Sequence, residues 1–400
     1  MSTTHHEHTD VVITGCGVAG GMLAGLLAKA GLRTIAIEKR PRIGEPIRCA
    51  EAAGSRKELS RFIPVDEEWI AADIDGVRLE GPDGNALERT IPSLGVVLRR
   101  DRFDRALARR ARAHGADIRT HVEAVGLERR GDAVTGIRCF DHEAQRPLNI
   151  AATLTVGADG VESTTARLAG LRRHFTASEI HSCYQYLMAG DEFAPSIIKI
   201  IAGEKIAPGG YVWIFPRGPG HANVGLGIHP GMADGGTAQE FLDRFVAERY
   251  PSARPVATVA GGTSGTRPLK TMVTDGLLLV GEGAGHNNPF SGGGIMNALE
   301  GAEEAAAVIT RCFRDGDVSG AALREYDRRW EKRNGRTIAR FAALRRFYFS
   351  LGDKDINALI SILDRQYPVD GSFDMDYAGL FKSAIQSNPG LVWKARKLLW

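Results

Sequence analysis

A glycine-rich turn between a strand and a helix constrains this chain more than any other feature. Residues 10–14 form a short apolar run, residues 18–30 combine small and apolar side chains, and residues 34–38 form a second apolar run. The turn itself reads Gly15-Cys16-Gly17-Val18-Ala19-Gly20. A strand, a Gly-x-Gly-x-x-Gly turn and a helix within about 30 residues open a doubly wound α/β domain that binds a dinucleotide.

Each glycine of this turn has a chemical reason. Gly15 permits the tight turn, Gly17 leaves room for a pyrophosphate beside the backbone, and Gly20 lets helix and strand pack closely. The N–H groups at the start of the helix then face the phosphates. Glu38 ends the second strand 18 residues after Gly20, where its carboxylate can accept hydrogen bonds from an adenosine ribose.

Composition and charge set the broad class. The 400 residues suffice for two or three domains, and 43% apolar with 25% charged residues is ordinary for a globular protein. A net charge of +3 gives no reason to expect a nucleic-acid partner. Five scattered cysteines without a Cys-x-x-Cys pair predict neither a disulfide framework nor an iron–sulfur cluster, which favours a reducing, cytoplasmic compartment.

The chain shows no signal peptide and no run of about 20 apolar residues, so we expect it not to span a membrane. His5, His6 and His8 lie in a polar stretch at the start of the chain. We interpret them as a flexible tail and expect no metal site. Trp393 to Trp400 mixes aromatic and basic residues; this segment either packs on the protein or lies at a bilayer surface.

Two later segments identify the dinucleotide. Val156–Gly160 ends a predicted strand with Asp-Gly, and Leu277–Gly285 places Glu282 among glycines after another strand. Both resemble the fingerprints of flavoproteins of the para-hydroxybenzoate hydroxylase type, which implies FAD. The usual acidic residue of the second fingerprint is Asp, so the longer Glu282 implies a shifted or water-mediated contact. Because no second Gly-x-Gly-x-x-Gly turn follows a strand, electrons must come from transiently bound NAD(P)H or from a protein such as ferredoxin.

Three further stretches narrow the resemblance. They are Pro46–Glu51, with the sequence Pro-Ile-Arg-Cys-Ala-Glu; Pro208–Pro216, which fits Pro-x-x-Tyr-x-Trp-x-Phe-Pro; and Asn288–Ile295. Together and in this order they resemble the geranylgeranyl reductase family over residues 10–345. The resemblance implies that reduced FAD saturates isolated C=C bonds of a prenyl chain. Geranylgeranyl diphosphate, an archaeol precursor, a chlorophyll side chain and menaquinone all remain open as substrates.

The resemblance also implies site residues. Arg100 matches an arginine that contacts the flavin, and an Ala stands at position 52 where many relatives have Gly. The expected substrate contacts are Tyr211, Trp213, Phe215 and Pro289. The expected cofactor contacts are Gly15, Gly17, Ala19, Gly20, Glu38, Lys39, Arg48, Cys49, Ala50, Arg100, Val125, Asp159, Gly281, Glu282, Gly293, Gly294 and Ile295.

Three interpretations are left open by the residues themselves. An unconjugated alkene needs a well-placed proton donor in a site that excludes water. Cys49 is the candidate catalytic donor, or else a small buried apolar residue. Tyr211, Trp213 and Phe215 alternate and therefore share one strand face, as core or, by the resemblance, as a lipid-contacting wall. His286 is either a surface residue or a proton relay.

The predicted fold is mixed α/β: a Rossmann-type FAD-binding domain, an antiparallel-sheet substrate domain and a helical C-terminal region. The FAD domain is expected to be discontinuous, from residues 1–75, 100–180 and 265–320. Residues 76–99 and 181–264 form the β-rich substrate domain, and residues 321–400 the helical region. The competing functions are a flavin monooxygenase or halogenase of an aromatic or polyketide-like molecule, and a flavoprotein that passes electrons to quinone.

Overall fold

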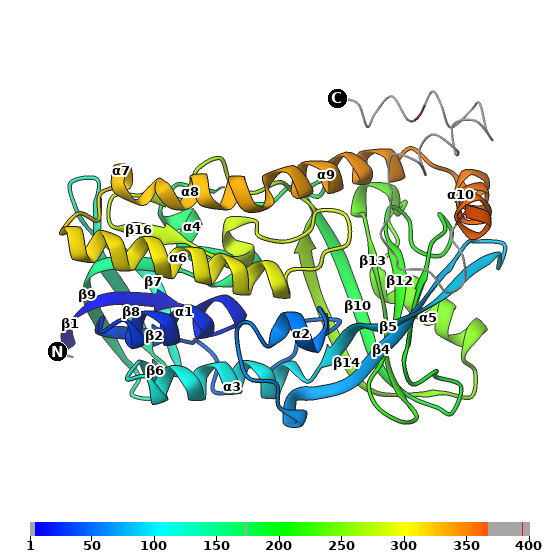
Figure 1. Ribbon diagram of the computed structural model, residues 1–400, viewed down its shortest axis with the longest axis horizontal. Coiled ribbons are helices and arrows are strands. Elements are labelled where there is room, and N and C mark those ends of the chain that lie inside the picture. Colours follow the sequence, from blue (N-terminus) through cyan, green and yellow to red (C-terminus); the bar gives the residue numbers. More distant parts are fainter. Residues whose placement is uncertain (1–4, 173, 367–393, 395–400) are drawn as a thin grey trace. The chain divides into compact units, whose positions relative to one another are not determined.

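The computed structural model describes residues 5–172, 174–366 and 394, and its chain forms two compact units (Figure 1). The first unit comprises Met1–Ile47, Arg100–His174 and Thr266–Ala339. The second comprises Arg48–Arg99, Phe175–Gly265 and Arg340–Trp400. Within the described residues, no helix is both long and apolar enough to cross a bilayer.

The first unit is built on a sheet whose central strands are parallel. Its order is β15-β16-β9-β1-β2-β6, with β7 and β8 joined to β9 as an antiparallel extension. The strands are β1 (His5–Thr14), β2 (Thr34–Ile37), β6 (Asp117–Arg119), β7 (Val122–Arg130), β8 (Ala133–Asp141), β9 (Arg146–Gly157), β15 (Val273–Thr274) and β16 (Leu277–Leu279). The parallel pairing of β1 with both β2 and β9 confirms the predicted Rossmann-type arrangement.

Helices cover this sheet. Small residues on α1 let it approach α3, since a Cβ at Gly25 would lie only 3.4 Å from the Cα of Ala111. Helix α6 packs on α1 and on α8 (Figure 1). The helices of the unit are α1 (Val18–Lys29), α3 (Arg100–Ala113), α4 (Thr164–Leu168), α6 (Ile295–Asp315), α7 (Gly320–Leu323) and α8 (Glu325–Trp330), followed by a π-helical turn, Glu331–Gly335.

The second unit is built on an eight-stranded sheet in the order β14-β10-β13-β12-β11-β4-β5-β3. It is antiparallel except where β11 pairs parallel with β4. Its strands are β3 (Ala52–Ala53), β4 (Ile70–Glu80), β5 (Ala86–Leu98), β10 (Ile180–Ala189), β11 (Ile197–Ile201), β12 (Tyr211–Pro216), β13 (His221–Ile228) and β14 (Arg254–Ser264).

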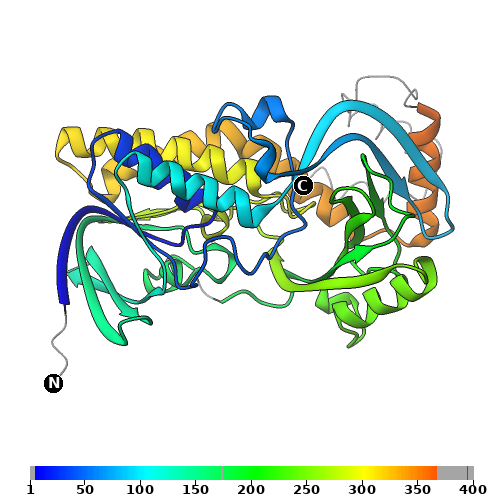
Figure 2. The ribbon, with the colours of Figure 1, turned by 90° about the horizontal axis from the view of Figure 1, so that it is seen from below.

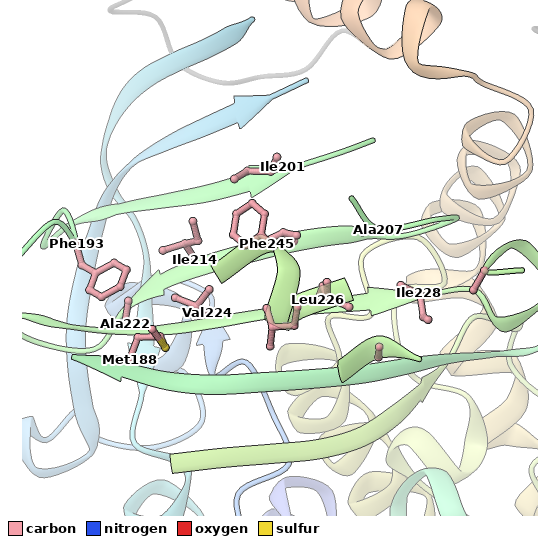
Figure 3. Close-up of a cluster of buried hydrophobic side chains, with 14 residues drawn as sticks. Met188, Phe193, Ile201, Ala207, Ile214, Ala222, Val224, Leu226, Ile228 and Phe245 are labelled. Carbon is pink, nitrogen blue, oxygen red and sulfur yellow. The ribbon is translucent and has the colours of Figure 1, made fainter. Parts of the chain in front are cut away.

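Alternation along β12 gives this sheet two apolar faces. Val212 and Ile214 join a cluster that α5 (Ala238–Arg249) covers through Leu242 and Phe245 (Figure 3). Trp213 and Phe215 point to the opposite face, with Tyr211 beside them. The prediction that Tyr211, Trp213 and Phe215 share one face is therefore confirmed.

The long β4–β5 hairpin carries a second cluster at its far end. There Leu87 packs against Phe347, near the end of α9 (Arg336–Tyr348), and against Ile356 and Ile360 of α10 (Asp353–Gln366). Figure 2 shows α10 beside this hairpin. A short helix, α2 (Arg56–Leu59), follows β3 and begins with a capping box between Ser55 and Glu58.

The two compact units and the sequence-based domain boundaries differ at residues 48–75, 175–180, 265 and 321–400, the last of which divide between the two units at residue 340. Residues 48–75 lie in the second unit because β3 and β4 pair with β5. Residues 321–339 lie in the first unit, where α7 and α8 pack against α6. The flexible tail expected at His5 is wrong, because the backbone from His5 onward pairs with β9.

Candidate functional site

Three loops of the first unit meet at the carboxyl ends of β1, β9 and β16. A Cβ at Gly15 would lie 2.6 Å from the carbonyl oxygen of Ala158. A Cβ at Gly281 would lie 2.9 Å from the Cβ of Ala19, and one at Gly283 would lie 3.0 Å from Ser163 Oγ. The glycines therefore permit backbone contacts that side chains would prevent, and ligands of doubly wound sheets bind at such strand ends.

The start of α1 is suited to an anion. Its N-terminal cap, Gly17, supplies no side chain to the first-turn N–H groups, and that turn carries no acidic residue. A Cβ built on Gly17 meets no atom within 4 Å, so the space beside it is open. Free N–H groups and the helix dipole favour a phosphate here.

Glu38 lies next to the same turn. Its Oε2 accepts a hydrogen bond from the backbone N–H of Cys16 at 3.2 Å, and its Oε1 accepts one from the N–H of Arg40 at 3.1 Å. These bonds hold the half-buried carboxylate beside the glycine turn with further lone pairs available. That is the position a ribose-binding carboxylate needs.

The loop after β9 contains polar atoms that lack partners. Asp159 Oδ2 accepts a hydrogen bond from the N–H of Thr165 at 2.7 Å, and burial raises the pKa of this carboxyl. Asp159 Oδ1 and Ser163 Oγ are buried and have no hydrogen-bond partner among the described residues. Buried polar groups are normally satisfied, so unpaired atoms beside three glycine loops fit a site whose ligand supplies the missing bonds.

A second uncapped helix, α6, begins beside the loop that follows β16. Gly294 caps α6 without a side-chain hydrogen bond, and no acidic residue occupies its first turn. Asn288 fixes the preceding loop, because its N–H bonds to the Gly293 carbonyl and its own carbonyl accepts from the Gly292 N–H, both at 2.8 Å. Gly293, Gly294 and Ile295 therefore present a helix start of the kind that stabilises negative charge.

The other residues of the first unit that were expected to contact the cofactor or the substrate have varied surroundings. Lys39 Nζ pairs with Glu162 at 2.7 Å. Arg100 forms two 2.8 Å hydrogen bonds with the carboxylate of Asp104. Val125, beside a bulge in β7, is 53% exposed. Glu282 is half-buried in the turn after β16, and Pro289 is buried in the loop before α6.

Cys49 lies in the second unit, where backbone and side-chain donors surround it. The N–H of Glu51 donates to Cys49 Sγ at 3.2 Å. The Gln185 amide donates to the Cys49 carbonyl at 3.4 Å, and the Asn223 amide donates to the Ala50 carbonyl at 3.2 Å. The segment with Arg48, Cys49 and Ala50 is thus tied to β10 and β13.

A buried ion pair fixes the residue after Ala50. Glu51 is 1% exposed, and Arg217 Nε donates to its Oε2 at 2.7 Å. Asn223 Nδ2 donates to the same oxygen at 2.8 Å, and the N–H of Leu98 bonds to the Glu51 carbonyl. Glu51 also has φ of +74°, which a side chain adopts only when its surroundings hold it there.

Tyr211, Trp213 and Phe215 form what we term the aromatic wall, and a glycine of β13 makes room for its indole ring. A Cβ at Gly225 would lie 2.6 Å from the Trp213 ring, so the indole lies flat on β13. Trp213 Nε1 donates to Gln185 Oε1 at 2.7 Å. Gln185 therefore joins Trp213 to the Cys49 carbonyl. Burial raises the pKa of Tyr211, which keeps this phenol neutral.

The sequence did not single out Glu51, Gln185, Arg217 or Asn223 as functional residues. Glu51 and Arg217 lie 166 positions apart, and no local pattern joins them. One signal was available: an acidic residue directly follows an apolar Cys-Ala pair, and Arg217 directly follows the aromatic strand.

The expectation that His286 is a surface residue is wrong. It is 1% exposed and stacks on Trp330 with ring centres 3.6 Å apart. Its Nδ1 accepts the N–H of Gly281 at 3.2 Å, so the proton resides on Nε2, which lies 3.0 Å from the Met272 sulfur. Burial lowers its pKa to about 3, so a neutral ring supports the glycine loop.

This burial predicts a pH-dependent stability. The folded-state pKa of His286, about 3, lies below the unfolded value of 6.5. The stability that the buried neutral ring contributes is therefore fully present above pH 6.5 and is lost as the pH falls towards 3. By pH 5 the loss amounts to about 2 kcal/mol. We expect the unfolding free energy of the wild type to fall by this much more than that of His286→Gln between pH 7.5 and 5, measured with urea. Equal pH slopes for the two proteins would contradict the assignment.

Two comparisons establish the family. A family model described as the geranylgeranyl reductase catalytic domain matches residues 179–263. A digeranylgeranylglycerophospholipid reductase of Methanothrix thermoacetophila is 37% identical over 394 residues, covering 98% of this chain and 99% of the relative. The chain belongs to the geranylgeranyl reductase family. A reductase of the same name from Methanococcoides burtonii is 35% identical, covering 98% of this chain and 95% of its own.

Comparison with solved structures shows which other proteins share the fold of this chain. A geranylgeranyl bacteriochlorophyll reductase-like protein of Thermoplasma acidophilum has a TM-score of 0.90 and 30% identity, covering 98% of this chain and 100% of that one. A flavin-dependent brominase has a TM-score of 0.72 at 19% identity, covering 98% and 93%, which shows a shared fold alone. The resemblance and the mixed α/β fold inferred from the sequence are confirmed.

Proposed function

We propose that this chain is an FAD-dependent oxidoreductase that saturates isolated C=C bonds of a prenyl chain on a lipid or diphosphate. The observation that carries the proposal is the near-full-length similarity to digeranylgeranylglycerophospholipid reductases, combined with a glycine-loop nucleotide site. Gly17 and the start of α1 would hold the pyrophosphate, and Glu38 the ribose. Asp159 and the loops at Gly281 and Gly293 would hold the rest of FAD.

When bound and reduced, FAD supplies a hydride for one alkene carbon. The other carbon needs a proton, and we assign it to the Cys49 thiol. Loss of that proton leaves a thiolate, and the Glu51 N–H at 3.2 Å from Sγ stabilises the negative charge. The ion pair of Glu51 with Arg217 positions this N–H, so both residues act through Cys49 rather than on the substrate.

Tyr211, Trp213 and Phe215 would line the path of the prenyl chain. Their apolar surface matches a hydrocarbon, and excluding water from it keeps the proton donor effective. NAD(P)H or ferredoxin would restore the reduced cofactor. A substrate this lipophilic also favours peripheral membrane contact. Lys394 pairs with Asp355 at 2.5 Å, whereas the other tail residues considered for that contact lie outside the described residues.

Gly17→Val tests the nucleotide site. Gly17 has φ of −73° and ψ of −164°, which valine adopts easily, and the chain leaves open space around it. We expect unchanged stability of the FAD-free protein but FAD binding weaker by about tenfold or more, because the new methyl groups occupy the phosphate position. Fluorescence titration of FAD measures the affinity, with Gly17→Ala as a graded control. Unchanged FAD affinity in Gly17→Val would refute this placement of the pyrophosphate.

Oxygen dependence tests the reaction class. A prenyl reductase gives a hydrogenated product in strictly oxygen-free buffer, whereas a monooxygenase or halogenase needs oxygen. We expect product formation with a geranylgeranyl lipid and a chemical reductant without oxygen. Product that forms only in air, carrying oxygen or halide, would replace the proposal with the alternative reaction class.

A further inference from the structure

The second unit contains a half-buried cation that no carboxylate of its described residues neutralises. Arg345, on α9, forms no ion pair with any carboxylate in the described part of the chain, and its Nε has no hydrogen-bond partner there. Its Nη2 donates to the Ser178 carbonyl at 3.4 Å, and its guanidinium lies 4.4 Å from the centre of the Phe349 ring. Burial lowers the pKa of this group.

Two histidines complete what we term the Arg345 cluster: Arg345, His181, His229 and Phe349. The Phe349 ring centre lies 6.1 Å from that of His181 and 5.0 Å from that of His229. The rings bond to main-chain carbonyls, His181 to Gly209 at 3.2 Å and His229 to Ser178 at 3.3 Å. Burial and the Arg345 charge lower the pKa of His181 to about 4, so the His181 ring is uncharged near neutral pH, whereas the Arg345 guanidinium keeps its charge.

The fold makes room for this cation. A Cβ at Gly265 would lie 2.7 Å from the guanidinium carbon of Arg345, so a larger residue there would displace it. Burying a charge without a partner is unfavourable. A guanidinium with a free Nε–H in such a place is suited to an anionic oxygen group, which it binds through paired N–H donors.

The cluster lies on the same sheet face as the aromatic wall. His181, Cys183 and Gln185 alternate along β10 and therefore share a face, and Gln185 bonds to Trp213. His181 and Gln185 are four residues apart, and four rises of about 3.3 Å give about 13 Å along the strand. Gln185 also bonds to the Cys49 carbonyl. Along this face, the charged Arg345 cluster is therefore followed by the apolar Trp213 ring and then by the segment that carries the Cys49 thiol.

We infer that Arg345 binds a phosphoryl group on the head of the prenyl substrate, whose chain then runs along Trp213 towards Cys49. This deepens the proposed function and rests on it. A phosphorylated head group and free phosphate share the chemistry that Arg345 recognises. The head group is favoured because the site lies at one end of an apolar face that leads to the thiol.

Arg345→Gln tests the inference with two substrates that share the prenyl chain and differ only in the diphosphate group. We expect its KM for geranylgeranyl diphosphate to rise about tenfold or more, as for a lost hydrogen bond to a charged group, with KM for geranylgeraniol within about twofold of the wild type. Arg345→Lys should retain part of the selectivity. The control is Arg346→Gln, since exposed Arg346 bonds to no group but the Ala342 carbonyl, at 3.4 Å, among the described residues, and both KM values should stay unchanged.

Other outcomes overturn the inference. An equal KM rise for both substrates would mean that Arg345 acts by packing, and no rise would mean that it meets no head group. Calorimetry with inorganic pyrophosphate distinguishes a failure of the Arg345 inference from a failure of the proposed function. If the wild type reduces neither of these two compounds nor a digeranylgeranylglycerol phospholipid, the proposed function fails; pyrophosphate binding lost in Arg345→Gln would then still support an anion site, and its absence would overturn that too. Lost pyrophosphate binding with unchanged KM would make this a free-anion site and overturn the head-group assignment.

Discussion

Replacing Cys49 with alanine is expected to lower the rate of alkene reduction about 100-fold without releasing FAD. A positioned general acid contributes roughly 10²–10⁴ to a rate, and the Glu51 N–H lies 3.2 Å from Sγ, where it would stabilise the thiolate of the proposed proton donor. The effect should fall on kcat, because the thiol acts on the reacting carbon and not on the rest of the chain. Single-turnover reoxidation of reduced flavin without oxygen measures it.

Two variants make the Cys49 result specific. Cys49→Ser keeps a hydroxyl of higher pKa and should retain an intermediate rate. Cys312→Ala removes a buried thiol on α6 and should leave kcat unchanged. Wild-type kcat in Cys49→Ala would show that the thiol is the small apolar residue of the alternative interpretation, and the proton would then come from another group.

Arg217→Met is expected to destabilise the second unit by about 3 kcal/mol. Removing one partner of a buried ion pair costs roughly 3–5 kcal/mol, because the remaining charge is left unpaired. Glu51 is 1% exposed, and the Asn223 amide would still donate to its carboxylate, so we expect a loss near the lower end of that range. Urea unfolding followed by tryptophan fluorescence measures the change.

A second substitution separates charge from packing. Adding Glu51→Gln to Arg217→Met removes the stranded charge and should recover more than half of the lost free energy. Arg328→Met breaks an exposed pair with Glu325 and should cost less than about 1 kcal/mol. Equal losses in Arg217→Met and Arg328→Met would show that the Glu51 pair does not hold the Cys49 segment.

The sequence predicted those parts of the fold in which chemistry demands a local pattern. The turn at Gly15 to Gly20 must join a strand to a helix, and the structure has β1, then α1 from Val18. Alternation alone placed Tyr211, Trp213 and Phe215 on one face. In each case the information lies within a few residues.

What the sequence missed depends on long-range packing. The strands from residue 48 onward follow the first βαβ unit directly, yet their pairing with β5 sets them in the other unit. His286 resembled a surface residue because its burial comes from Trp330, 44 positions later. The Glu51–Arg217 and Arg345 clusters likewise join residues from distant segments, and no local spacing encodes such contacts.

The measurement that tests the central claim most directly is a stoichiometric, oxygen-free titration. The FAD-loaded protein is reduced with dithionite, and a geranylgeranyl lipid is added while the flavin absorbance band and the lipid mass are followed. The account predicts that the oxidised band returns and that the lipid gains two hydrogens for each flavin reoxidised. A flavin that stays reduced until air is admitted, with the lipid mass unchanged, would contradict it.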